Sequence, residues 1–167
     1  VPERRGFDEF FGFIIGGHRY FPEDLTINDL TEARRQMDGY ITRIYDNGNR
    51  IDTKKYLTEE LSDNAVKFIE DNSDNPFFLY LSYNAPHTPL QATKKDLERN
   101  MHIEVEKRRI YAAMVSSMDD GIGLILDKLE EKKITDNTIV IFFSDNGGVE
   151  WYNFSDNGVL RGIKGDF

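Results

Sequence analysis

The segment FFLYLSY at residues 77–83 is a continuous run of apolar and aromatic side chains, and the polar turn NAPHTP follows it at residues 84–89. A run without alternating polar residues is typical of a strand that is buried on both faces of a sheet. A second run, TIVIFF at residues 138–143, has the same character and leads into Ser144, Asp145 and Asn146. We therefore expect two fully buried strands.

Between these strands, roughly residues 105–133 are predicted to form one long helix. Their apolar side chains recur at helical spacing in a single stripe, which consists of Tyr111, Met114, Val115, Met118, Ile122, Ile125, Leu126 and Leu129. A strand, a long helix and a second strand make a βαβ unit, a crossover that is nearly always right-handed. The sequence thus predicts an α/β fold with a mostly parallel sheet flanked by helices.

The N-terminal part of the chain has two readable segments. Residues 4–23 are rich in aromatics and glycine without a regular period, so we expect a packed loop region with a short helix at residues 7–11. Residues 40–46 alternate like a strand, and Asn47-Gly48 then provides a tight turn into Arg50 and Ile51. This pattern predicts a β-hairpin.

A shorter helix is expected to begin at a Thr58 cap and to run to about Asp71, before Asn75-Pro76 stops the segment. Near the C-terminus, residues 150–153 (EWYN) have mixed character and are interpreted as loop.

Composition restricts the class of protein. The chain has 167 residues, of which 39% are hydrophobic and 31% charged, as expected of a soluble globular protein. Its net charge of −9 argues against a nucleic-acid or anionic-membrane partner, because both require a basic face. No apolar run is long enough to span a bilayer. Cysteine is absent, which excludes disulfides and cysteine nucleophiles within these residues.

Polar residues at the ends of the two buried strands are the first candidates for a site. In open α/β sheets, ligands bind outside the carboxyl ends of the strands. One strand leads to His87, held between Pro86 and Pro89, and the other leads to Asp145 and Asn146. Taken alone, His87 is more often a surface histidine in a rigid turn than a residue aimed at a ligand. Asp145 and Asn146 offer the hard oxygen ligands that Ca²⁺ or Mg²⁺ prefers, or they form a strand-to-loop turn.

The pentapeptide Phe-Ser-Asp-Asn-Gly occurs twice, at residues 143–147 and 154–158, and a third Asp-Asn-Gly occupies residues 46–48. No buried strand precedes the copy at Asp156-Asn157-Gly158, so we interpret it as a turn that brings Lys164 into place. Residues 46–48 are interpreted as the hairpin turn.

Four other polar positions remain. Lys164, between Gly162 and Gly165, could approach an anion closely or be an exposed loop lysine. His18 could line a substrate pocket, and His102 has the character of a surface residue. Asp119 and Asp120 are adjacent in a helix and point about 100° apart, so a structural role is favoured over paired acid–base chemistry.

Taken together, four stretches of the chain resemble the sulfatase family, in the alkaline-phosphatase-like superfamily. They are RGFDEFFGF, PFFLYLSYNAPHTPLQA, the SMDDGIG helix followed by DNTIVIFFSDNG, and NGVLRGIKGD. The resemblance extends nearly end to end, and it is strongest to bacterial arylsulfatases and N-acetylgalactosamine-6-sulfatase-like proteins. It implies that residues 1–167 are part of a single sulfatase catalytic domain, truncated at both ends.

The resemblance also implies roles for particular residues. Asp145 and Asn146 match late calcium ligands of the family, His87 matches its active-site histidine and Lys164 its sulfate-binding lysine. The family's formylglycine nucleophile comes from a Cys or Ser two residues before a Pro, a pattern that this chain lacks. The nucleophile and the remaining calcium ligands would therefore lie outside these residues. A periplasmic or secreted location is implied for the intact protein.

Three functional hypotheses follow. The first is a Ca²⁺-dependent sulfuric ester hydrolase that acts on a sulfated sugar or an aryl sulfate. The second is a phosphate or phosphonate ester hydrolase on the same scaffold, because the tetrahedral anion makes similar demands. The third is a catalytically inert piece or a binding module for anionic sugars. We expect the isolated chain to be inactive and to self-associate, because an apolar sheet edge would be exposed.

Overall fold

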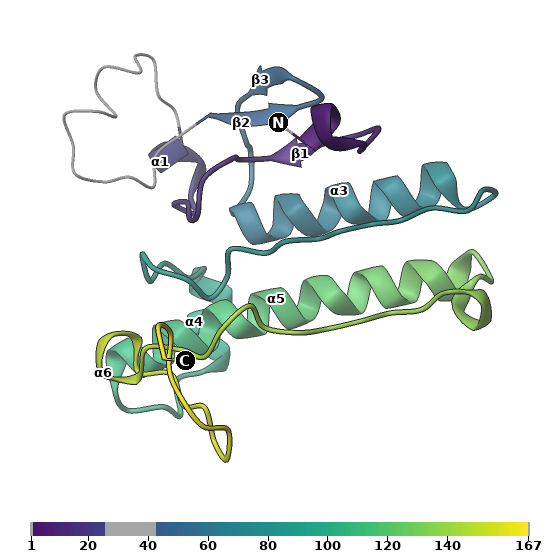
Figure 1. Ribbon diagram of the computed structural model, residues 1–167. Helices are drawn as coiled ribbons and strands as arrows, with labels where there is room; N and C mark the ends of the chain where they lie inside the picture. The colour runs from purple at the N-terminus through teal and green to yellow at the C-terminus, as the bar shows by residue number, and fades with distance from the viewer. Residues whose placement is uncertain (1, 26–42, 167) are drawn as a thin grey trace.

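The computed structural model of the chain describes residues 2–25 and 43–166 (Figure 1). In chain order the elements are η1 (Pro2–Arg5), β1 (Phe11–Gly12), α1 (Pro22–Leu25), β2 (Ile44–Asp46), β3 (Asn49–Ile51), α3 (Leu57–Asn72), α4 (Lys94–Arg99), α5 (Glu106–Glu131), η2 (Thr135–Asn137) and α6 (Glu150–Asn153). They form three tiers, with the small sheet on α3 and α3 on α5, while α4 and α6 gather near the start of α5 (Figure 1).

The core lies where these tiers meet. Its buried residues are Tyr20, Ile44, Tyr56, Leu57, Leu61, Ala85 and Met114. α3 contributes because Leu57, Leu61, Ala65 and Ile69 recur at helical spacing and are all buried. Each large apolar side chain that is fully removed from water stabilises the fold by roughly 1.5–3 kcal/mol.

Helix α5 confirms the long helix predicted from the apolar stripe. Met114 and Leu129 of that stripe are buried, and α5 packs along α3. Leu126, which was expected in the stripe, is 44% exposed, because it lies about 100° around the helix from Ile125. Gly121 lets the two helices approach, since a methyl group there would lie 2.1 Å from Ser62 Oγ.

The hairpin prediction is confirmed for the residues that the structure describes. β2 and β3 pair antiparallel, and Asn47 and Gly48 between them have φ of 47° and 79°. Positive φ at both turn positions is the requirement of a type I′ turn. Residues 40–42 of the predicted strand lie outside the described residues.

The helix predicted at residues 7–11 is wrong. Those residues are irregular up to Phe11, where β1 begins and pairs antiparallel with β2. Phe10 is tied to the hairpin turn by two 2.8 Å bonds: its carbonyl accepts from the Asn47 amide, and its amide donates to Asn47 Oδ1. These bonds hold the segment extended, where a helix would need the same groups for its own ladder.

Helix α3 is confirmed, but Thr58 does not cap it. The capping position is Tyr56, and Thr58 is fully buried inside the first turn. The start of the helix is satisfied from outside instead, because the Leu57 amide donates to the Tyr20 carbonyl at 2.7 Å. Glu60 also reaches back, and its Oε1 accepts from the Lys54 amide at 2.7 Å. Tertiary contacts thus replace the local cap.

The two buried strands predicted at residues 77–83 and 138–143 are also corrected. Both segments run extended beside the helices in Figure 1, but neither is paired as a strand. Tyr80 is 60% exposed, Ile139 is 90% exposed and Phe143 is 68% exposed. A strand needs neighbours on both sides to bury its backbone and side chains. Within the described residues, the only sheet is the antiparallel order β1-β2-β3.

Three short helices, α1, α4 and α6, were not predicted. α4 is capped by Thr93, whose Oγ1 accepts from the Asp96 amide at 3.2 Å. Thr-Lys-Lys-Asp at residues 93–96 is a capping pattern that could have indicated it. α6 replaces the loop expected at residues 150–153, and it ends at Phe154 with φ of 60°. Across the described ranges, no helix is both long and apolar enough to cross a membrane.

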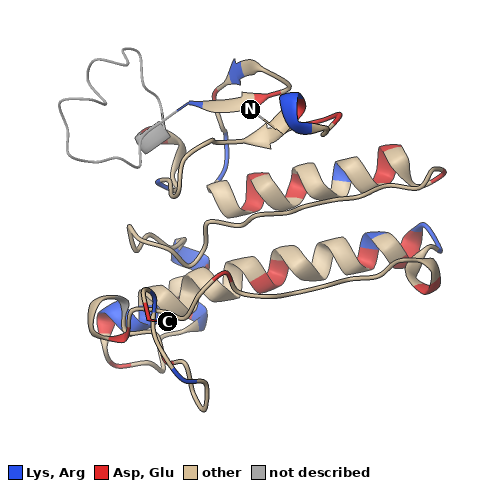
Figure 2. Ribbon diagram, in the orientation of Figure 1, with Lys and Arg blue, Asp and Glu red and all other residues tan. Residues whose placement is uncertain are grey.

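Charged residues hold the helices together at their solvent face. Figure 2 shows acidic residues along α3 and α5 and a concentration of basic residues around α4. Asp120 on α5 accepts from Arg99 at 2.6 Å and from Lys95 at 3.1 Å, which fastens α4 to α5. Glu70 on α3 similarly pairs with Lys128 of α5 and with Lys132, the residue that caps the end of α5. The structure therefore agrees with a structural role for Asp120.

Candidate active site

His87 lies in the turn that follows the extended segment of residues 77–83. Its amide donates to the Asn84 carbonyl at 2.7 Å, and its Nδ1 lies 2.8 Å from the Thr88 carbonyl oxygen. A carbonyl oxygen can only accept, so Nδ1 carries the proton and Nε2 of the neutral ring keeps its lone pair. The turn therefore fixes both the orientation and the tautomer of the imidazole.

Lys164 meets this lone pair. Its Nζ lies 3.3 Å from His87 Nε2, a contact between residues 77 positions apart in the chain. The ammonium donates and Nε2 accepts. Gly162 and Gly165 on either side have φ of 91° and 96°, a backbone region that favours glycine, and they curl the loop around the lysine. The two predicted catalytic residues are thus brought together at a position open to solvent.

Tyr20 anchors the His87 turn. Its hydroxyl proton is shared between two acceptors, the carbonyls of Asn84 at 2.9 Å and His87 at 2.8 Å, while its ring stacks on Tyr56 with centroids 5.4 Å apart. The side chain is fully buried. Burial, with a smaller contribution from Tyr56, raises the pKa of the Tyr20 hydroxyl well above its usual value. The hydroxyl therefore stays protonated and keeps donating to the turn.

His18 lies beside the same turn but inside the fold. Its side chain is fully buried, its Nδ1 is 3.0 Å from the Arg19 carbonyl, and its ring packs on Phe13 at 4.9 Å between centroids. Asn84 Nδ2 donates to the His18 carbonyl at 3.2 Å. These contacts support the His87 turn. A direct contact of His18 with substrate stays a prediction.

Asp145 and Asn146, the predicted metal pair, follow the second extended segment. Both residues are exposed. Asn146 Nδ2 donates to the Gly147 carbonyl at 2.9 Å, and the Asn146 carbonyl accepts from Ser144 Oγ at 2.7 Å. Neither the Asp145 carboxylate nor Asn146 Oδ1 has a hydrogen-bond partner among the residues that the structure describes. Two hard oxygen donors are thus available side by side in the chain.

These two donors fit a hard cation as part of its ligand set. Ca²⁺ takes about six to eight oxygen ligands, so two residues cannot complete a site. The described ranges contain no cluster of three or more His, Cys, Asp or Glu side chains with metal-binding geometry. Asp145 and Asn146 can therefore contribute to a metal centre, and further ligands would have to come from other residues.

The second copy of the pentapeptide is the turn that the sequence predicts. Asp156 Oδ1 accepts from the Gly158 amide at 2.8 Å, which closes an Asx-turn, and Gly158 has φ of 58°. Unlike Asp145, the Asp156 carboxylate is thus already engaged with its own backbone. The Asp46 copy is likewise the β2–β3 turn.

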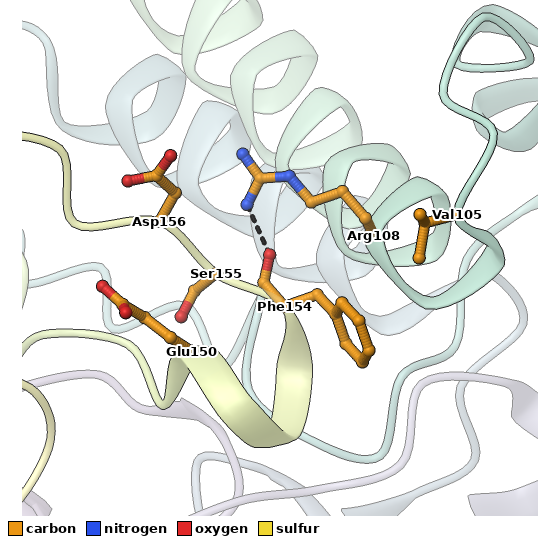
Figure 3. A pocket seen from close by; sticks show the side chains of 6 residues that line it. All are labelled: Val105, Arg108, Glu150, Phe154, Ser155 and Asp156. Atoms are coloured by element: carbon orange, nitrogen blue, oxygen red, sulfur yellow. Dashed lines mark hydrogen bonds between the residues drawn. The ribbon is translucent and has the colours of Figure 1, made fainter.

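The second copy is fastened to α5 beside an open hollow of about 470 Å³. Figure 3 shows Arg108 donating to the Phe154 carbonyl, a bond of 2.6 Å, with Glu150 and Asp156 on the other side of the hollow. Lys107 lies 5.8 Å from the centre of the Phe154 ring. The hollow faces two carboxylates as well as one guanidinium, so its charge does not single out an anion site. The contacts of Arg108 and Lys107 beside it hold Phe154 against α5.

Two contributors to the site were missed from sequence. Tyr20 was assigned to an irregular aromatic segment, and Asn84 only to the polar turn that follows the first predicted strand. Their roles depend on contacts with residues 64 and 66 positions away in the chain. The local sequence pattern does not show which distant residues will be in contact. The signal that is present is weaker: Tyr20 and Asn84 are polar groups within aromatic and apolar segments, where a buried polar group needs a hydrogen-bond partner.

Comparison with known proteins adds an independent line. A sequence profile of the sulfatase family matches residues 1–166. The chain belongs to the sulfatase family. It is 32% identical, over 98% of its length, to the uncharacterized sulfatase YdeN of Escherichia coli, and 33% identical, over its full length, to arylsulfatase J of Mus musculus. It covers 26% and 27% of these relatives, so this sulfatase chain spans about a quarter of the curated proteins that it matches.

Solved structures agree with this assignment. The crystal structure of Ps i-CgsB in complex with k-i-k-neocarrahexaose matches 99% of the chain and 38% of that protein, with 39% identity and a TM-score of 0.85. The sulfatase yidJ from Bacteroides fragilis, described as putative, matches 82% of the chain and 32% of that protein, with 20% identity and a TM-score of 0.57, which supports the fold alone. The α/β, alkaline-phosphatase-like fold class predicted from the sequence is confirmed.

Proposed function

We propose that the protein to which this chain belongs is a sulfuric ester hydrolase of arylsulfatase type. The observation that carries the proposal is the 3.3 Å contact between Lys164 Nζ and His87 Nε2. It unites two residues whose motifs match the family and whose chemistry suits an anionic ester. Membership of the family over residues 1–166 supports the same reaction class.

Lys164 would bind the oxygens of the sulfate group. Its ammonium is a compact positive charge at an exposed position, and Gly162 and Gly165 leave room for a close approach. Charge that develops on the sulfate oxygens during the reaction is stabilised by a cation that is already in place.

His87 would act on the bridging ester oxygen through Nε2. Since the Thr88 carbonyl holds Nδ1 as a donor, Nε2 is the nitrogen that gains and loses the proton. In the protonated ring, Nε2–H no longer accepts from Lys164 and would donate to the ester oxygen instead, while Lys164 turns to the sulfate oxygens. When the S–O bond breaks, that proton passes to the leaving oxygen and gives a neutral alcohol or phenol.

Asp145 and Asn146 would supply two oxygen ligands to Ca²⁺, which when bound stabilises negative charge on the sulfate and on the attacking oxygen. We propose a formylglycine nucleophile, derived from a Cys or Ser outside residues 1–167. The chain would then form part of one catalytic domain, with the nucleophile and its other metal ligands contributed by the rest of that domain.

A sulfated carbohydrate is the proposed substrate class. One structural relative is bound to a neocarrahexaose, and another relative is an N-acetylgalactosamine-6-sulfatase of Homo sapiens, 32% identical over 87% of this chain. Both names refer to sugars. A periplasmic or secreted location, as the family resemblance implies, is proposed with it.

The test compares hydrolysis of p-nitrophenyl sulfate and p-nitrophenyl phosphate by the whole protein. We expect turnover of the sulfate, and a drop in kcat of about 10²–10⁴-fold in His87→Ala, as for loss of a general acid. Lys164→Ala should cost about 10²–10³-fold, as for loss of a charge-stabilising donor. His102→Ala, at an exposed histidine, is the matched control and should retain activity. Preferential turnover of the phosphate would refute the proposal.

A further inference from the structure

Asn157, the central residue of the second pentapeptide, does more than form a turn. Its Oδ1 accepts from the Gly148 amide at 2.9 Å. Its Nδ2 faces the carbonyls of Gly148 at 3.3 Å and Gly162 at 3.2 Å, and Glu150 Oε1 at 3.3 Å. One side-chain amide thus touches the loop that follows Asp145 and Asn146 and also the loop that carries Lys164.

The loops that Asn157 joins are in close contact. A methyl group on Gly147 would lie 2.9 Å from the Gly162 carbonyl and 3.3 Å from Ile163 Cα. A methyl group on Gly148 would lie 2.2 Å from Ser155 Oγ. At Gly147 the nearest atoms are backbone atoms of Gly162 and Ile163, so the two loops meet there through their backbones, whereas Gly148 packs on the Ser155 side chain. We call the contacts of Asn157 with Gly148 and Gly162 the Asn157 clasp.

The clasp lies between two groups with separate chemical roles. Gly147 and Gly148 come directly after Asp145 and Asn146, and Gly162 comes two residues before Lys164. His87 contacts Lys164, so the two residues form one of these groups and the metal pair forms the other. The clasp is the hydrogen-bonded connection that the described residues provide between the metal pair and the Lys164–His87 pair.

The clasp is itself fixed to the body of the fold. Arg108 of α5 donates to the Phe154 carbonyl at 2.6 Å (Figure 3). Residues 154–158 are therefore attached to α5 and to each of the two loops. Through Asn157, the position of α5 fixes where both loops lie.

From these contacts we infer that Asn157 is a positioning residue, which sets the separation between Asp145 and Asn146 on one side and Lys164 and His87 on the other. The inference rests on the proposed sulfate-ester chemistry for the meaning of that separation. Small displacements matter in such a site, because misplacement of a reacting group by about 1 Å can cost about 10²-fold in rate.

The test uses the whole protein and two matched variants. Asn157→Ala removes every bond of the clasp, whereas Asp156→Ala removes a bond of the same turn that touches neither loop. We expect kcat on p-nitrophenyl sulfate to fall about 10²-fold in Asn157→Ala with little change in KM. Calorimetric titration of the same variant should give a calcium dissociation constant about 10-fold larger, as for residues that orient metal ligands. Asp156→Ala should remain near the wild type in both.

Asn157→Asp tests the Nδ2 contacts separately, because it keeps the size of the side chain and loses its donor group. Its carboxylate can still accept from the Gly148 amide, but its second oxygen would face the Gly162 carbonyl and Glu150, which are acceptors. We therefore expect it to stay defective in calcium affinity, although its volume is unchanged. Recovery to wild-type affinity in this variant would overturn the role of the Nδ2 contacts.

Hydrogen exchange separates this inference from the proposed function. In Asn157→Ala, amides of residues 146–149 and 162–165 should exchange faster, whatever reaction the protein catalyses. If the wild type hydrolyses no sulfate ester, the proposed function fails, while faster exchange in both loops together with weaker calcium binding still supports the clasp. Unchanged exchange and unchanged calcium affinity in Asn157→Ala would overturn it.

Discussion

The two copies of Phe-Ser-Asp-Asn-Gly are identical in sequence and opposite in use. In the copy at residues 143–147, the Asp145 carboxylate and Asn146 Oδ1 have no hydrogen-bond partner within the described residues. In the copy at residues 154–158, Asp156 closes its own turn and Asn157 joins two loops. The first copy leaves its oxygens available to a ligand, and the oxygens of the second copy accept hydrogen bonds from the protein's own backbone.

The difference comes from what precedes each copy. An extended apolar segment leads to Asp145, so the residues that follow it emerge at the end of that segment and remain exposed. The one-turn helix α6 leads to Phe154, whose φ of 60° turns the chain back on itself. Identical side chains then meet different neighbours. A short motif therefore predicts a role only together with the element before it.

The largest expected effect is on catalysis, and it distinguishes the acidic residues of the two copies, Asp145 and Asp156. Asp145→Ala in the whole protein should lower kcat/KM for p-nitrophenyl sulfate by at least about 10²-fold, because it removes a charged ligand of the proposed metal centre. Removal of calcium with a chelator should have a similar effect. Asp156→Ala should stay within about 3-fold, since it loses one exposed turn bond. Equal losses in the two variants would contradict the division of roles.

The glycines that end the two copies should respond differently to asparagine. Gly158 has φ of 58° with open space around it, and asparagine tolerates that backbone region. Gly147 is crowded by Gly162 and Ile163. Gly147→Asn is therefore expected to destabilise the protein by about 1–3 kcal/mol, as overpacking does. Gly158→Asn should change stability by less than about 0.5 kcal/mol. Thermal unfolding of the whole protein measures both.

A third test concerns the support of His87 by Tyr20. Tyr20→Phe keeps the stacked ring but removes the hydroxyl that donates to the Asn84–His87 turn. We expect a loss of about 0.5–1.5 kcal/mol in the free energy of unfolding, the usual net contribution of one intramolecular hydrogen bond. Tyr45→Phe, at a partly buried strand position, is a control with the same chemical change. Equal stability of the two variants would argue against the anchoring role.

The smallest effect is expected at Asp120, away from either copy. Hydrogen bonds from Arg99, and then from Lys95, hold the pKa of this carboxyl below its usual value. A lowered pKa means that the pairs stabilise the fold above the unfolded pKa and lose that effect as pH falls through the folded pKa. Because Asp120 is 39% exposed, Asp120→Asn should cost only about 0.2–1 kcal/mol at pH 7.

Urea unfolding at two pH values checks this prediction. The difference between Asp120→Asn and the wild type should shrink when the pH is lowered to below the folded pKa, while activity at neutral pH is unchanged. A difference that grows in acid would have the wrong sign for an ion pair.

Sequence predicted the locally determined parts of the fold well. α3, α5 and the β2–β3 hairpin follow from periodicity and from Asn47-Gly48, which are properties of neighbouring residues. The segments at residues 77–83 and 138–143 were predicted as paired strands, and the described residues contain no partner for them. Pairing depends on other parts of a protein, so an apolar run alone cannot establish it.

The candidate site was predicted in part for the same reason. His87, Lys164, Asp145 and Asn146 stand in recognisable motifs, and the contact of His87 with Lys164 agrees with a shared site. Tyr20 and the bridging role of Asn157 were not predicted, because each depends on backbone groups from another part of the fold. Sequence named the residues that carry functional groups more readily than those that hold them in position.

The exposed run at residues 139–143 also bears on how the protein is made. α3 and α5 can pack as soon as both have left the ribosome, since each contacts the other along its length. The extended run has no strand partner in the described residues and stays in water until one arrives. At roughly 5–20 residues per second, synthesis leaves such a segment uncovered for seconds. A peptide scan for chaperone binding should therefore give a maximum at residues 138–143, where the nascent chain is most in need of protection.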